Sequence, residues 1–141
     1  AQNSVYDNQP DTQVPTVVNT SPELPNTLTI HFSEGMDSLS LENAVFTSHP
    51  NLSIASRTLI GKYPTEITFV FNEVLVPGQI YTYSINDFSD CSGNTNSYAG
   101  TFVLPQTPVK GDLIINEILF NPLTGGSDFV EIYKHSDKYI D

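Results

Sequence analysis

Apolar and polar residues alternate with a period of two along four short stretches of the chain. In residues 27–32, Leu28, Ile30 and Phe32 fall on one face, and two threonines and a histidine fall on the other. Residues 65–71, 79–86 and 98–104 follow the same pattern. Because side chains of a strand point alternately to opposite faces, this period predicts half-buried strands that share one core.

Turn-forming residues separate these stretches. Pro50, Gly61, Pro64, the pair Pro77-Gly78 and Gly93 lie between them, and such residues typically end strands. Only residues 40–44 suggest a helix, of about one turn. We therefore predict the all-β class, as an Ig-like antiparallel β-sandwich of about seven strands.

Proline and polar segments suggest a division of the chain. Residues 1–14 are polar and are interpreted as a leader or linker, residues 15–105 as the sandwich, and residues 106–111 as a second linker. The stretches 112–120 and 128–133 then predict a C-terminal β-hairpin. A lone hairpin is marginally stable in water, so we interpret 112–141 as the start of a truncated second β domain.

Charge excludes two classes of partner. The net charge is −11, with 16 acidic against five basic side chains, so nucleic acid and anionic membrane surfaces would be repelled. No apolar run approaches the roughly 20 residues that a membrane helix needs, which argues against membrane insertion. Cys91 is the single cysteine, so the chain has no internal disulfide and no cysteine pair for zinc or redox chemistry.

Three motifs within 15–104 resemble the bacterial Ig-like domain of the surface-layer-protein type. The segment 22–37 ends in an apolar strand and Phe-Ser-Glu-Gly-Met-Asp, 75–83 carries Leu-x-x-Gly-x-x-Tyr, and 90–94 carries Asp-x-x-Gly-Asn ahead of Phe102. The resemblance implies Ig-like units that act as spacers or adhesive surfaces outside the cell.

The C-terminal residues resemble a second family, the bacterial lamin-tail domain. The resemblance rests on Ile115-Asn116-Glu117-Ile118, on Asn121-Pro122 and on residues 128–133. It covers the first third or so of such a domain, and Lys134 stands where Asn is common. Since bacterial lamin-tail domains often accompany secreted nucleases and other surface proteins, the resemblance implies a secreted or cell-surface protein.

One acidic loop is the candidate calcium site. It contains Asp87, Asp90, Ser92 and Asn94, whose oxygens suit a hard cation, although their spacing differs from the EF-hand ladder. The same residue types satisfy the backbone of a loop, and this structural role is the favoured interpretation. The Ca²⁺ candidates are Asp87, Asp90 and Asn94, and no other cofactor is predicted.

The segment 34–37 allows two interpretations. Glu34 and Asp37 are oxygen ligands in one of them, but two carboxylates are too few to hold calcium. In the favoured interpretation Asp37 caps the next turn, Gly35 supplies a positive φ and Met36 fills the core.

The remaining reactive side chains suggest no catalytic site. The hairpin carries three acids, Glu117, Asp128 and Glu131, near Asn116. We interpret these acids as edge charges that discourage aggregation rather than as an acid–base pair. The histidines at 31, 49 and 135 lack metal-ligand spacing. Cys91 has no basic neighbour in the sequence to activate it.

We therefore predict a module without catalytic residues, and not an enzyme. We interpret it first as a structural spacer of a multidomain secreted or cell-surface bacterial protein, in contact with neighbouring domains of the same chain. The alternatives are an adhesion module that binds a carbohydrate or protein ligand, or an accessory part of a secreted hydrolase or nuclease. The exposed edges of the hairpin also predict a homodimer formed through it.

Overall fold

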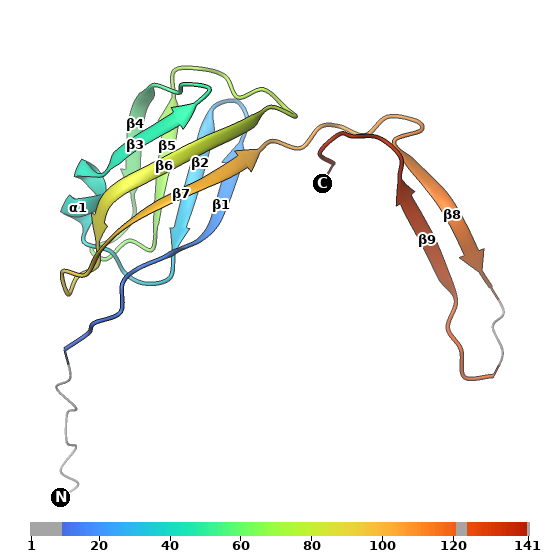
Figure 1. Cartoon of the computed structure of the whole chain (residues 1–141), viewed down its shortest axis with the longest axis horizontal. Coiled ribbons are helices and arrows are strands. Elements are labelled where there is room, and N and C mark those ends of the chain that lie inside the picture. Colours follow the sequence, from blue (N-terminus) through green and yellow to red (C-terminus); the bar gives the residue numbers. More distant parts are fainter. Residues whose placement is uncertain (1–9, 121–123, 141) are drawn as a thin grey trace, which may run out of the picture.

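The computed structural model of the chain describes residues 10–120 and 124–140. The first nine residues of the predicted leader and the Asn121-Pro122 motif lie outside the described residues. Nine strands and one short helix are present in the described part (Figure 1). In chain order they are β1 (Val17–Glu23), β2 (Thr27–Phe32), α1 (Ser38–Asn43), β3 (Val45–His49), β4 (Ile54–Leu59), β5 (Glu66–Phe71), β6 (Ile80–Ser89), β7 (Thr95–Val103), β8 (Leu113–Leu119) and β9 (Phe129–Lys134).

The first seven strands form two sheets that face each other. One sheet has the order β1-β2-β5-β4 and the other β3-β6-β7, and every pairing is antiparallel. This four-plus-three arrangement is that of a constant-type Ig sandwich. The predicted all-β sandwich of about seven strands is confirmed.

The core consists of the apolar faces that the alternation predicts. Each predicted inward residue of β2 and β5 is at most 4% exposed. Phe46 of β3 joins the sheets, because its ring centroid lies 4.9 Å from that of Phe69 and 5.5 Å from that of Phe71. With no tryptophan and a single cysteine in the chain, aromatic pairs fill the space that a tryptophan and a disulfide occupy in antibody domains.

A hydrogen-bonded tyrosine orders the approach to β6. The hydroxyl of Tyr81 accepts a 3.1 Å hydrogen bond from the backbone N–H of Val76, which is the arrangement called a tyrosine corner in Ig-like folds. On the same strand, the hydroxyl of Tyr83 lies 2.7 Å from that of Thr20 in β1 and links the two sheets.

Two strands are longer than the alternation predicts. β6 continues past residue 86 because a bulge after Ile85 shifts the register, and the buried side chain of Phe88 then falls out of phase with those before it. β7 begins at Thr95 rather than at 98, since its first residues are polar and leave no apolar pattern to detect.

The C-terminal strands β8 and β9 form a separate two-stranded sheet. Asp112 links the segment before β8 to the segment after β9. Its carboxylate accepts hydrogen bonds of 2.7 Å from both the Lys138 ammonium and the Val109 N–H. The Lys138 hydrogen bond, then the Val109 N–H, lower the pKa of Asp112 against the opposing effect of burial. The hairpin is present as predicted, while its assignment to a second domain stays a prediction.

The one helix of the described residues, α1, is short. No helix in this part of the chain has the length and apolar character needed to span a membrane.

Candidate functional site

Three segments far apart in the sequence meet at one end of the sandwich: residues 10–16, the loop after β2, and the β6–β7 turn. Thr16 and Ser33 exchange hydrogen bonds, in which Thr16 N–H donates to Ser33 Oγ at 3.0 Å and Ser33 N–H donates to Thr16 O at 2.9 Å. Asn94 Nδ2 donates to the carbonyl of Asp11, 83 positions away. The end of the segment predicted as a linker is thus held against the loops.

Asp90 organises the β6–β7 turn. Its side chain is almost fully buried, and one carboxylate oxygen accepts 2.8 Å hydrogen bonds from the N–H groups of Ser92 and Asn94. The other oxygen accepts a 2.7 Å hydrogen bond from the amide of Asn94. Burial raises the pKa of Asp90, but these hydrogen bonds outweigh it and lower the pKa overall. These contacts favour the loop-stabilising role over a calcium site.

Asp87 stands apart from this turn. It is exposed, lies at the bulge of β6 and has a φ of 62°, a conformation that Asp tolerates better than most residues. Its backbone N–H donates to Ser97 Oγ at 3.3 Å. The structure therefore brings Asp90 and Asn94 into contact, while the calcium role of all three residues stays a prediction.

A second carboxylate grouping involves a residue that the sequence analysis did not single out. Among the described residues, carboxylate oxygens of Asp11, Glu34 and Asp90 lie within 4.8 Å of one another. Burial, followed by repulsion from Asp11 and Asp90, raises the pKa of Glu34. No sequence signal pointed to Asp11, because its segment has neither a period nor a motif.

Several oxygens of the acidic grouping already accept hydrogen bonds within the described part of the chain. Calcium takes six to eight oxygen ligands, and both oxygens of Asp90 already accept hydrogen bonds from the turn. Asp11 Oδ1 accepts one from the Gln13 N–H. The geometry can hold three carboxylates in mutual repulsion, which destabilises the ionised form of Glu34.

The residues of the loop after β2 take largely structural positions. Asp37 Oδ1 accepts a 2.8 Å hydrogen bond from the Ser40 N–H and caps α1, and Met36 is fully buried. The expectation for Gly35 is wrong, because its φ is not positive. Its small size matters instead, since a Cβ there would lie 3.2 Å from the Cβ of Tyr63.

Cys91 lies beside the acidic end of the sandwich, the end that carries Asp11, Glu34 and Asp90. Its exposed thiol contacts the carbonyl of Gly35 at 3.5 Å. Burial and the negative charges of Asp37, Asp90 and Glu34 raise the pKa of this thiol, although Lys62 acts in the opposite direction. A raised pKa leaves little thiolate at neutral pH, as expected for an unreactive cysteine.

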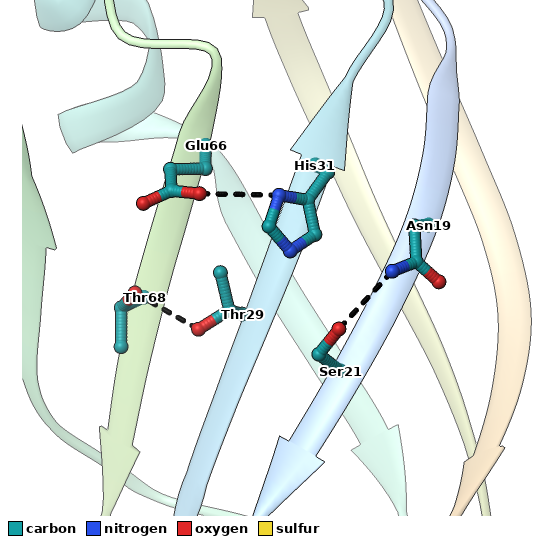
Figure 2. Close-up of polar contacts among 6 residues, drawn as sticks. All are labelled: Asn19, Ser21, Thr29, His31, Glu66 and Thr68. Atoms are coloured by element: carbon teal, nitrogen blue, oxygen red, sulfur yellow. Dashed lines mark hydrogen bonds and ion pairs between the residues drawn. The ribbon is translucent and has the colours of Figure 1, made fainter.

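The outer face of the four-stranded sheet is covered by short polar side chains. The Thr29 and Thr68 hydroxyls lie 3.0 Å apart, and His31 Nδ1 lies 3.1 Å from Glu66 Oε2. Figure 2 shows both contacts between β2 and β5. Thr58 of β4 pairs with Thr68 on the other side of β5, so three threonines lie side by side across β2, β5 and β4. These side chains satisfy one another across neighbouring strands, and they form no nucleophile–base–acid arrangement.

The acids of the hairpin lie on an open sheet. Glu117 and Glu131 are directly opposite each other and exposed. Asn116 Nδ2 donates to Glu131 Oε1 at 2.5 Å. Acid–base chemistry on a substrate needs a site that excludes water, which this face does not provide, so their edge-charge role stays the favoured prediction.

Comparison with solved structures gives a fold match. The chain is similar to surface-layer protein rSbsC(31-844), with a TM-score of 0.57 and 19% sequence identity over 74% of this chain. A second structure, SbsC domains 1-6, matches with a TM-score of 0.53 and 19% identity over 75% of this chain. At this identity the likeness shows a shared fold.

The match is to a small part of those proteins. The chain spans only 15% and 16% of the two S-layer structures. No family model matches the chain, and no curated protein matches it. The resemblance of residues 112–141 to a lamin-tail domain stays a prediction.

Proposed function

We propose that this chain is a non-catalytic structural module of a multidomain, secreted or cell-surface bacterial protein, in which the sandwich spaces or displays neighbouring domains. The observation that carries the proposal is the fold shared with surface-layer protein SbsC. Sandwich domains suit this role because both faces are closed by their own side chains and the ends remain available for connections.

The polar groups of the acidic end support a structural role. Asp90 and Asp37, the carboxylates with the strongest motif signal, are engaged by backbone N–H groups of their own loops. A hollow of about 580 Å³ near this end is lined by Glu34 and by uncharged residues. Glu34 also lies near the carboxylates of Asp11 and Asp90, but both oxygens of Asp90 accept hydrogen bonds from its own turn, which supports a structural role for the group.

A domain-replacement experiment tests the proposal. In the full-length parent protein, residues 15–105 are replaced by an unrelated sandwich with similar end-to-end spacing, and a deletion of the same residues serves as the comparison. A spacer predicts that the replacement restores surface display and the activity of neighbouring domains, whereas the deletion impairs them. Failure of a well-folded replacement would show that this surface itself is needed.

A glycan array tests the adhesion alternative, and a hydrolase substrate panel tests the non-catalytic assignment. Specific glycan binding by the full chain would favour an adhesion module. Turnover that follows the chain through purification and disappears on unfolding would contradict the non-catalytic assignment.

A further inference from the structure

The hairpin formed by β8 and β9 has two unlike faces. Its register pairs Leu113 with Lys134 and Ile115 with Ile132. Asn116 then forms a bulge, so that Glu117 pairs with Glu131 and Ile118 with Val130. Face A, as we call the first side, consists of Leu113, Ile115, Ile118, Val130, Ile132 and Lys134. Face B, on the opposite side, consists of Ile114, Glu117, Leu119, Phe129, Glu131 and Tyr133.

Face A is apolar along its length and uncovered. Its five apolar side chains are between 45% and 62% exposed, and the one charged residue, Lys134, stands at its end. An apolar strip of this kind is about as large as the largest patch that a typical monomer exposes, and such patches often mark a contact surface.

Face B differs from face A in carrying two acids, although its other four side chains are large and between 38% and 57% exposed: Ile114, Leu119, Phe129 and Tyr133. Glu117 and Glu131 lie opposite each other at its centre, and Asn116 donates a hydrogen bond to Glu131. Burying this pair would force two like charges together in a low dielectric. A sheet with one apolar and one charged-centre face packs through the apolar one.

We propose that face A is a self-association surface, through which two copies of this chain pack hairpin against hairpin about a two-fold axis. The contact would create a four-stranded, two-layer unit whose charged B faces remain in water, which is a stable alternative to two isolated hairpins. The proposal does not depend on the function of the sandwich.

The area of face A favours a second copy as the occupant. The net charge of −11 opposes self-association in general, but this repulsion is smallest at face A, because all six of its residues lack a negative charge. Each of the five apolar side chains leaves on the order of 100 Å² in water, so the pair would bury roughly 1,000 Å², near the lower limit for a specific interface. The dimer is therefore expected to be weak and concentration dependent.

Sedimentation equilibrium of the full chain tests the proposal, over roughly 5 to 500 µM, a range that brackets weak dissociation constants. We expect the mass to rise from the 15.5 kDa of one chain to twice that value and no further. Ile115→Asp, on face A, should weaken association at least about tenfold, while the neighbouring Ile114→Asp, on face B, should change it by less than about threefold.

Hydrogen exchange separates loss of the interface from loss of the hairpin. If the dimer forms, amide protection in β8 and β9 rises with protein concentration in the wild type and in Ile114→Asp but not in Ile115→Asp. Equal weakening by both variants, or growth of the mass beyond two copies, would overturn the two-fold face-A contact. A monomer at every concentration would also overturn it, and further strands of a second β unit would then be the occupant.

Discussion

Two leucines of α1 provide a matched test of the packing. Leu41 is fully buried, whereas Leu39, two positions earlier in the same turn of helix, is 65% exposed. The helix packs against β6 and is capped by Asp37. Arg57 of β4 donates to the carbonyl of Leu41 at 3.2 Å, near the C-terminal end of the helix.

Leu41→Ala should destabilise the sandwich strongly. Removing a fully buried leucine costs about 2 to 5 kcal/mol, because apolar transfer is lost and a cavity remains. For a domain of this size each kcal/mol lowers the melting temperature by roughly 4 to 8 °C, so we expect a fall of at least about 8 °C. Leu39→Ala removes the same atoms from water-exposed surface and should change stability by less than about 0.5 kcal/mol.

Urea unfolding measures both variants. Tyrosine fluorescence reports on the core, since the chain has seven tyrosines and no tryptophan, and circular dichroism reports on the sheets. The midpoint of Leu41→Ala should fall with an unchanged m-value. If Leu39→Ala lowers the midpoint as much as Leu41→Ala does, the placement of the helix against the core is wrong.

Three further changes test the acidic end and the tyrosine corner. Tyr81→Phe removes the acceptor of the Val76 N–H and should cost about 0.5 to 1.5 kcal/mol in urea unfolding, whereas no loss would contradict a stabilising bond. The folded-state pKa of Asp90 is lowered from 3.8, so its carboxylate stabilises the fold above that pH. The stabilisation is lost as the pH falls through the folded value. Asp90→Asn should thus lower the melting temperature at pH 7 and differ less from the wild type in acid; a constant difference would refute this. The pKa of Glu34 is raised from 4.5, so ionisation there opposes folding at higher pH. In EDTA, Glu34→Gln should raise the melting temperature at pH 7 but not below pH 4.5. A calcium-induced rise in melting temperature that Glu34→Gln loses would instead support an ion site.

Four strands of the sandwich, β2, β5, β6 and β7, could be placed from the sequence because one face of each is apolar. β2 and β5 lie where the alternation of Leu28, Ile30 and Phe69 places them, with those side chains fully buried. The extension of β6 could not be predicted, since the bulge at Asp87 shifts the phase of the pattern by one residue. The alternation of apolar and polar residues does not reveal where a bulge inserts an extra residue into a strand.

At the acidic end, the sequence predicted the role of one residue but not the grouping of the carboxylates. The capping role of Asp37 follows from local chemistry, because the Ser40 N–H that it binds is three residues away. The grouping of Asp11 with Glu34 and Asp90 depends on how three distant segments pack. A polar segment without a period gives no indication of its place in the fold.

The sequence by itself determined the class of this protein, an all-β sandwich, and the apolar face of each main strand. Both follow from the two-residue repeat of a strand and from the free energy of burying apolar side chains. Only the tertiary structure decided which carboxylates lie together and which face of the hairpin is left apolar in water. Those outcomes depend on a bulge and on contacts between distant segments, and neither leaves a periodic signal along the chain.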